Sequence, residues 1–130
     1  MIVLDASVVV ELLLETQLAH AVRRELAARS ESLLAPHLLD IEVASALRRL
    51  TGGQRIDAHR SRELLSSLAA LPVERYAHTP LLGRIWELRH NFTCYDAAYI
   101  ALAEATNSSL YTTDAKLIKG HRARVVLVRG

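Results

Sequence analysis

The sequence has one cysteine, no apolar run of membrane length and no glycine-rich loop, and each absence excludes a class of protein. With Cys94 as the only cysteine, no internal disulfide can form, and we expect a cytoplasmic protein. No apolar stretch approaches the roughly 18 residues of a membrane span, and no basic leader precedes the first apolar residues. We therefore expect neither a membrane association nor a signal peptide. The absence of a glycine-rich phosphate loop argues against a P-loop nucleotide-binding protein.

Several side chains that commonly carry catalysis are also missing. The six histidines show no zinc-binding spacing. Glu87 and His90 match one half of a di-iron Glu-x-x-His motif, whose second half is absent. Cys94 has no base beside it, which is typical of a small buried hydrophobic residue. A zinc, di-iron or cysteine-nucleophile site is therefore not expected.

The composition is that of a single globular domain over residues 1–130. Hydrophobic residues make up 51% of the chain and charged residues 23%, which is enough apolar material for a core. The net charge is only +2, but the basic residues are unevenly placed. Arg48 and Arg49 form one cluster, and no acid follows Asp114, whereas five basic residues do: Lys116, Lys119, Arg122, Arg124 and Arg129. Such clusters are most often solvated, and they are also candidates for contacts with a polyanion.

Two apolar segments each run into an acid. Residues 1–4 show no polar alternation, which predicts a strand buried on both faces, and Asp5 follows directly, with Ser7 two residues later. The stretch 110–113 repeats this pattern and ends at Asp114. Ligands of open α/β sheets bind beyond the carboxyl ends of the strands, so we expect both acids to face one crevice.

The rest of the chain alternates predicted strands with predicted helices. Helix ends are marked by Gly52 and Gly53, by Pro72 and by Asn107, and Thr79 is predicted to cap a helix that opens at Pro80. Strands are expected near 1–4, 33–35, 73–76, 110–113 and 125–128, and helices over 8–14, 19–29, 37–50, 58–71, 80–90, 97–106 and 115–119. This alternation predicts a three-layer α/β/α fold around a mainly parallel sheet of about five strands, with helices on both faces.

Two more acids lie at or on predicted helices. Glu42 is at the margin of the apolar face of the helix after Pro36, where it needs a partner, such as Arg49, or solvent. Asp96 directly precedes a helix, as Asp5 and Asp114 do, so each of these three alone is explained as a helix N-cap. N-capping does not explain why the three should share one edge of the sheet with Glu42 leaning inward. A carboxylate cluster that binds a hard divalent cation explains it.

Such a cluster is typical of a magnesium site. Mg²⁺ is held by a few carboxylates, keeps several waters and binds phosphate oxygens readily. It activates water and stabilises the leaving oxygen in phosphodiester hydrolysis, and this chemistry needs no protein nucleophile. The residues therefore favour a metal-dependent phosphodiesterase.

Four ordered segments form a recognisable pattern: IVLDAS at 2–7, DIEVASALRR at 40–49, YDAAYIALAE at 95–104 and TTDAKL at 112–117. Together they resemble the PIN-domain ribonucleases, and most of all the VapC-type toxins of toxin–antitoxin pairs. The resemblance implies a PIN-like fold and a Mg²⁺- or Mn²⁺-dependent endoribonuclease that acts on RNA. It also implies a homodimer and a cognate antitoxin whose C-terminal segment lies over the active site.

The same resemblance implies roles for individual residues. The catalytic acids are Asp5, Glu42, Asp96 and Asp114, of which the three aspartates bind the metal. Ser7 and Thr113 occupy supporting polar positions. We expect Arg48 and Arg49, together with Lys116, Lys119 and the other basic residues after Asp114, to ring the acids and hold RNA phosphates.

Two other functions remain open from the sequence. A flavodoxin-like phosphoacceptor or binding module also gathers acids at strand ends. A response-regulator receiver would be expected to have paired acids after its first strand, however, and here Ala6 follows Asp5. The second alternative is a PIN-like domain that scaffolds a complex without catalysis, and the intact acids are weak evidence against it.

Overall fold

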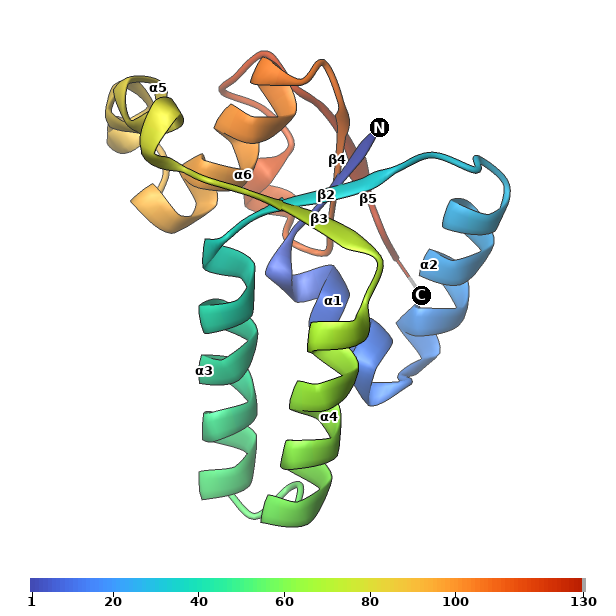
Figure 1. The fold of residues 1–130 in the computed structure, drawn as a ribbon. Coiled ribbons are helices and arrows are strands. Elements are labelled where there is room, and N and C mark those ends of the chain that lie inside the picture. Colours follow the sequence, from blue (N-terminus) through green and yellow to red (C-terminus); the bar gives the residue numbers. More distant parts are fainter. Residues whose placement is uncertain (130) are drawn as a thin grey trace.

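The computed structural model describes residues 1–129, in which strands and helices alternate (Figure 1). The strands are β1 (Ile2–Leu4), β2 (Leu33–Pro36), β3 (Val73–Tyr76), β4 (Ser109–Thr112) and β5 (Arg124–Leu127). The helices are α1 (Ala6–Leu14), α2 (Gln17–Ala27), α3 (Leu38–Gly52), α4 (Ala58–Ala70), α5 (Leu82–Glu87) and α6 (Cys94–Ala105). Short 3₁₀ turns cover Thr79–Leu81, Leu88–His90 and Ala115–Leu117. No helix within residues 1–129 is long and apolar enough to cross a membrane.

The five strands of residues 1–129 form one parallel sheet in the order β3-β2-β1-β4-β5. The first strand of the sequence is therefore the central strand, which explains why residues 2–4 are apolar without alternation. In the register, β1 pairs Ile2 with Leu33 of β2 and Leu4 with Tyr111 of β4.

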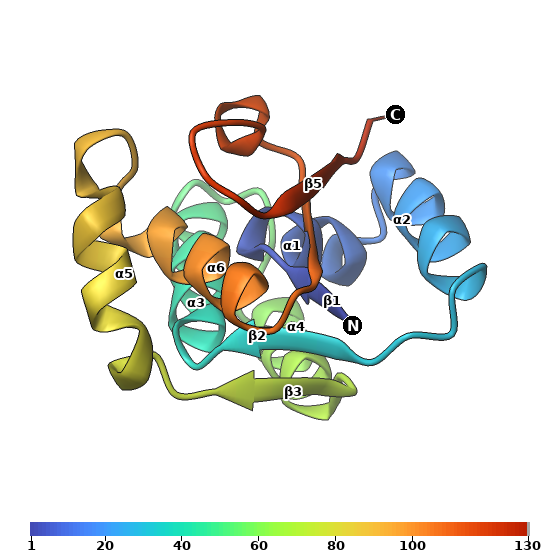
Figure 2. The same ribbon diagram turned by 90° about the horizontal axis from the view of Figure 1, so that it is seen from above.

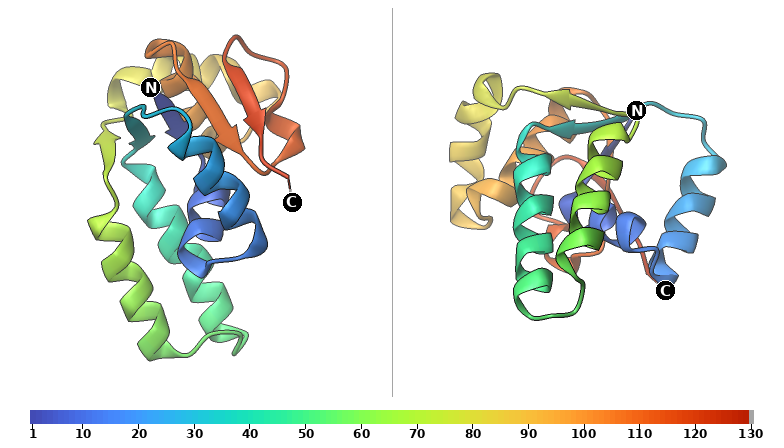
Figure 3. Two further views of the ribbon diagram at one scale, coloured as in Figure 1. Left: turned by 90° about the vertical axis from the view of Figure 1, so that its right-hand side faces the viewer. Right: turned by 60° about the horizontal axis from the view of Figure 1, so that its bottom comes forward.

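Helices cover both faces of this sheet. The chain crosses from β1 to β3 in one direction and from β3 through β4 to β5 in the other, so right-handed crossovers place the connecting helices on opposite faces. Accordingly, α1 to α4 lie below the strands in Figure 1, and α5 and α6 lie above them. In the view from above, α6 is in front of α3 (Figure 2), and α3 and α4 project from the sheet as an antiparallel pair (Figure 3). The predicted three-layer fold is confirmed.

The core is built around β1 and α6. Residues 97–103 of α6 are all buried, and four of these seven are alanines. Small side chains let a helix axis approach a sheet closely, and α6 contacts β1, β2 and β4. This close packing brings the first turn of α6 to the sheet edge where β1 and β4 end.

Four local predictions were wrong. The helix expected over 80–90 is split into a 3₁₀ turn, α5 and a second 3₁₀ turn, and Thr79 lies inside the first turn rather than capping it. Pro80 offers no N–H and Gly83 is a weak helix former, which favours short pieces. The expected helix over 115–119 is only the 3₁₀ turn Ala115–Leu117. Cys94 is exposed at the start of α6 rather than buried.

Candidate functional site

The candidate site lies where the strand order reverses, at the carboxyl ends of β1 and β4. Asp5 is the residue after β1, and Asp114 comes two residues after β4. Because Leu4 is aligned with Tyr111, Asp5 lies beside Thr112. Such a reversal point is where open α/β sheets bind their ligands.

The carboxylate of Asp5 is fixed by two hydroxyl groups. Thr112 Oγ1 donates to Asp5 Oδ2 at 2.7 Å, and Ser7 Oγ donates to the same oxygen at 2.8 Å. Each hydroxyl in turn accepts a backbone N–H: Ser7 Oγ from Thr113 at 3.1 Å and Thr112 Oγ1 from Asp114 at 3.0 Å. These four bonds orient Asp5 and tie the end of β1 to the end of β4.

Thr112 is a site residue that the sequence did not reveal. The supporting position was assigned to Thr113, which contributes a backbone N–H, whereas the fully buried Thr112 supplies the hydroxyl that binds Asp5. Side chains alternate between the faces of a strand, so neighbouring threonines point in different directions. Only the register between β1 and β4 identifies which of them lies beside Asp5.

The structure brings all four predicted acids together. The pKa values of Asp5, Glu42 and Asp96 are raised, in each case mainly by burial, which disfavours the charged form. Neighbouring acids raise them further: Asp96 acts on Asp5, both Asp5 and Asp96 act on Glu42, and Asp114 acts on Asp96. For Asp5, the hydrogen bonds from the two hydroxyls oppose the effect of burial. The four acids are therefore coupled electrostatically, with Asp96 linking Asp114 to Asp5 and Glu42.

Helix capping explains only one of the three aspartates. Asp114 Oδ1 accepts the N–H of Lys116 at 2.9 Å and so caps the 3₁₀ turn. Asp96 is the third residue of α6, whose N-cap is Thr93, and the Asp96 N–H donates to Thr93 Oγ1 at 3.1 Å. Asp5 stands at the N-cap position of α1, but its side chain turns to the hydroxyls described above. The N-cap interpretation is therefore wrong for Asp5 and Asp96.

Glu42 faces a buried tyrosine that the sequence did not single out. Within residues 1–129, Glu42 Oε1 and the Tyr99 hydroxyl are both buried without a hydrogen-bond partner of ordinary geometry. They are nevertheless close enough that Tyr99 lowers the pKa of Glu42 against the larger effect of burial. Tyr99 lies three residues after Asp96 on α6 and so shares its side of the helix, a spacing that would have identified it. The described chain forms no ion pair between Glu42 and Arg49.

The donor set fits a hard divalent cation that keeps part of its water shell. Within residues 1–129, no group of three or more His, Cys, Asp or Glu side chains is already arranged to hold a metal ion. The fit therefore rests on the chemistry of the oxygen donors, which differs from the closed tetrahedral cage of a structural zinc site. Mg²⁺ needs only one or two carboxylates with waters in the remaining positions, and Mn²⁺ prefers the same oxygen ligands. The mutual repulsion of the acids is relieved by such an ion.

The four basic residues expected at the site are not equivalent in position. Lys116 lies beside the acids, since its charge lowers the pKa of Asp96, and Lys119 is exposed just beyond the 3₁₀ turn. Arg49 lies two helical turns after Glu42 on the same side of α3, about 10 Å along the helix axis. Arg48 instead lines a groove between α3 and α4.

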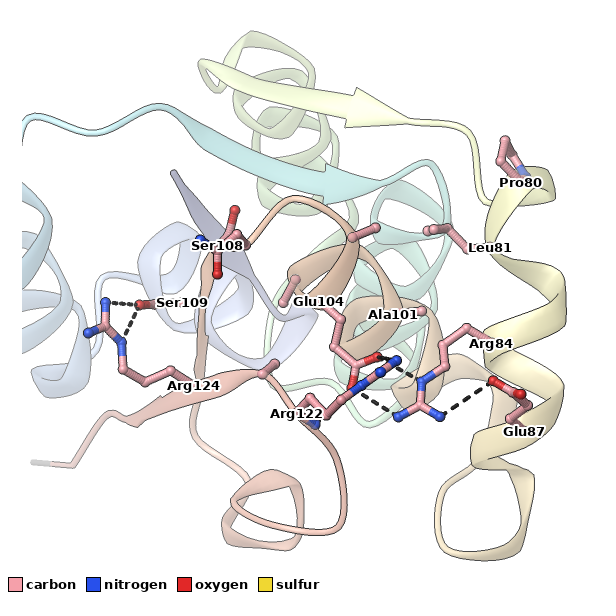
Figure 4. A pocket seen from close by; sticks show the side chains of 14 residues that line it. Pro80, Leu81, Arg84, Glu87, Ala101, Glu104, Ser108, Ser109, Arg122 and Arg124 are labelled. Atoms are coloured by element: carbon pink, nitrogen blue, oxygen red, sulfur yellow. Dashed lines mark hydrogen bonds and ion pairs between the residues drawn. The ribbon is translucent and has the colours of Figure 1, made fainter.

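Two further basic residues lie at the opposite edge of the sheet, beside a hollow of about 940 Å³ (Figure 4). There the nearly buried Glu104 accepts two hydrogen bonds from Arg84, at 2.7 and 3.0 Å, and the backbone N–H of Arg122 at 2.8 Å. Arg124 donates to Ser109, the first residue of β4, at 3.0 and 2.8 Å. The expectation that Arg122 and Arg124 ring the acids is therefore wrong. The Arg122 N–H holds the segment before β5 to Glu104 of α6, and Arg124 holds β5 to the first residue of β4.

Comparison with known proteins agrees with this arrangement. The family model of the PIN domain matches residues 2–121, which include all four acids. The VapC ribonuclease Mb0985 of Mycobacterium bovis is 46% identical over 117 residues, covering 90% of this chain and 88% of the relative. Ribonuclease VapC12 of Mycobacterium tuberculosis is 41% identical over 130 residues, covering 98% of this chain and 99% of the relative.

Solved structures show the same fold at lower identity. PAE2754 from Pyrobaculum aerophilum superimposes with a TM-score of 0.73 at 23% identity, covering 95% of this chain and 86% of that one. VapBC2 from Rickettsia felis, solved bound to a DNA fragment from its promoter, gives a TM-score of 0.73 at 13% identity, with 99% and 100% covered. The extent of the family match and the identity to two VapC ribonucleases argue against a flavodoxin-like phosphoacceptor or binding module. The chain belongs to the PIN-domain family, among the VapC ribonucleases.

Proposed function

We propose that this chain is a metal-dependent endoribonuclease, the toxin of a toxin–antitoxin pair, which hydrolyses RNA phosphodiester bonds in the cytoplasm. The observation that supports the proposal is the electrostatic coupling of four carboxylates, from four separate segments, near the reversal point of the sheet. The VapC relatives are named ribonucleases, which supports RNA as the substrate class.

The proposed site uses Asp5, Asp96 and Asp114 to hold Mg²⁺ or Mn²⁺, with Glu42 as the fourth catalytic acid. A bound ion supplies an activated water and stabilises the charge that develops on the scissile phosphate. Ser7 and Thr112 keep the Asp5 carboxylate in one orientation, and the backbone N–H of Thr113 supports Ser7. Orientation by hydrogen-bonded neighbours of this kind tunes the affinity of a metal site.

RNA phosphates are held by basic side chains around the crevice. Lys116 and Lys119 follow Asp114 directly, and Arg49 extends the positive surface along α3, with Arg48 at longer range. Phosphate contacts release counterions, so binding weakens steeply with salt. An acidic crevice with a basic rim orients a polyanion while the acids remain available for the metal.

Two protein partners complete the proposal. An antitoxin segment that carries an arginine would fit the crevice, because its guanidinium pairs with carboxylates in a bidentate manner and competes with the metal. The toxin also forms a homodimer, for which the exposed Leu82 and Trp86, one turn apart on α5, supply apolar surface.

Cleavage assays with purified protein test the function. We expect RNA cleavage with Mg²⁺ or Mn²⁺, none with EDTA, and none by Asp96→Asn. Asp57→Asn is the matched control, because Asp57 caps α4 by accepting the Arg60 N–H at 2.7 Å and Asn caps nearly as well. Cleavage that persists in EDTA would refute the metal dependence, and a parent protein that binds metal but cleaves no RNA would indicate a scaffold.

A further inference from the structure

One unsatisfied donor and one unsatisfied acceptor lie beside each other in the candidate site. Within residues 1–129, only three buried side-chain oxygen or nitrogen atoms have no hydrogen-bond partner, and two of them are Glu42 Oε1 and the Tyr99 hydroxyl. Leaving a buried polar group without a partner costs about 1–3 kcal/mol. The Tyr99 hydroxyl lowers the pKa of Glu42 as a hydrogen-bond donor does, so the two groups are near enough for a bond of good geometry once either side chain turns.

The two hydroxyl groups that orient Asp5 are already committed. Ser7 and Thr112 both donate to Asp5 Oδ2 and cannot serve Glu42 at the same time. Tyr99 is fully buried, and of the charged groups that act on its hydroxyl, Glu42 has the largest effect, ahead of Asp5 and Asp96. A tyrosine hydroxyl is protonated at neutral pH and is therefore a donor. Tyr99 is placed to donate to Glu42.

If only the ring of Tyr99 mattered, a phenylalanine would fill its place in the core equally well. A second buried tyrosine of the same chain, Tyr111, serves as the comparison. Tyr111 is the third buried group without a partner; it is also fully buried, on β4. The charges that act on Tyr111 belong to Glu25, Arg29, Glu31 and Arg124, none of which is among the four acids. Tyr111 thus represents a buried tyrosine hydroxyl without a role at the crevice.

We propose that Tyr99 is a positioning residue: its hydroxyl donates a hydrogen bond to Glu42 Oε1 when a divalent cation occupies the crevice, and so fixes the Glu42 carboxylate toward the ion and its waters. This inference rests on the proposed metal-dependent function. The hydroxyl itself does not touch the substrate. Its contribution is to prevent Glu42 from turning away, because the hydroxyls of Ser7 and Thr112 are committed to Asp5.

The test compares Tyr99→Phe with Tyr111→Phe by direct Mn²⁺ titration, with calorimetry or electron paramagnetic resonance as the readout. Removing a hydroxyl that has no partner in the metal-free protein should leave the melting midpoint of both variants at or slightly above that of the parent. Tyr99→Phe should weaken Mn²⁺ binding by about 10-fold or less, because Glu42 faces the ion and its waters and the 10- to 100-fold range applies to groups that hold a ligand directly. Tyr111→Phe should bind Mn²⁺ as the parent does.

A double-mutant cycle separates positioning from packing. In a Glu42→Gln background, Tyr99→Phe should cause little further loss of Mn²⁺ affinity, because the oxygen that it positions no longer carries charge. Equal Mn²⁺ binding by Tyr99→Phe and the parent would overturn the proposal, as would a melting midpoint well below that of Tyr111→Phe. A parent that binds no Mn²⁺ would overturn the proposed function as well, which distinguishes the two failures.

Discussion

Binding of a divalent cation should raise the melting temperature substantially, because the carboxylate cluster exists only in the folded chain. Its residues come from four segments, and Asp5 and Thr112, which meet at its centre, are 107 positions apart. At a free metal concentration one hundred times the dissociation constant, linkage stabilises the folded state by about 2.7 kcal/mol. An unfolding entropy of roughly 2.1 cal/mol/K per residue gives about 270 cal/mol/K for 130 residues, and therefore a rise of about 10 °C.

Asp96→Asn perturbs this rise without disturbing the helix. The backbone N–H that Thr93 caps remains, while one ligand charge that raises the pKa values of Asp5 and Glu42 is lost. The metal-free variant should melt at or above the parent temperature, because repulsion is relieved. If the variant binds metal 10- to 100-fold more weakly, the same metal concentration stabilises it by only about 0.4–1.4 kcal/mol, or roughly 2–5 °C.

Differential scanning calorimetry of the parent, Asp96→Asn and Asp57→Asn, with and without Mg²⁺, measures both effects. Asp57→Asn makes the same chemical change at the cap of α4, and it should retain the full metal-induced rise. Identical rises in all three proteins would show that Asp96 is not a ligand. The absence of any rise in the parent would refute the carboxylate cluster as a cation site.

Three further outcomes are expected. Burial and neighbouring acids raise the pKa of Glu42, so its contribution to stability is present below the ordinary glutamate pKa and is lost as the pH rises through the raised pKa. Metal-free Glu42→Gln should therefore have a higher melting temperature than the parent at pH 8. A difference in melting temperature that does not narrow toward pH 4 would contradict this. Glu104→Gln should lower the free energy of unfolding in urea by about 1.5–3 kcal/mol, because charge-assisted hydrogen bonds from Arg84 to a nearly buried carboxylate are lost. The control Glu87→Gln, at an exposed position, should change the free energy of unfolding by less than about 0.5 kcal/mol. Lys116→Gln should reduce the slope of log affinity for single-stranded RNA against log salt by about 0.7, and Arg124→Gln, at the other edge of the sheet, should leave it unchanged.

The layers of the fold could be predicted from the sequence, because strand and helix patterns alternate and parallel crossovers have one hand. The four acids could be predicted to meet for a related reason: Asp5 and Asp114 each follow a strand, and the carboxyl ends of parallel strands share one edge. The same logic would have placed Arg124 correctly. It opens a parallel strand, and the amino ends of parallel strands lie opposite the acids.

What the sequence could not supply was the contacts across the chain. Thr112 and Thr113 are equivalent in composition, and only the register between β1 and β4 decides which hydroxyl reaches Asp5. The lack of a partner for the Tyr99 hydroxyl likewise depends on the distance between α6 and the sheet. An alanine-rich pattern predicts that this distance is short but does not give its value. Pairings over such distances are set by tertiary packing rather than by local preference.

The hydrogen bond between Asp5 and Thr112 also sets the earliest point during synthesis at which the proposed site can be complete. Asp5 leaves the ribosome long before Thr112, which follows 107 positions later. Until β4 has been made, the central strand has a neighbour on one side only, and the nascent chain contains acids but no crevice. The site of the proposed nuclease can therefore be completed only late in translation, when the central strand receives its second neighbour.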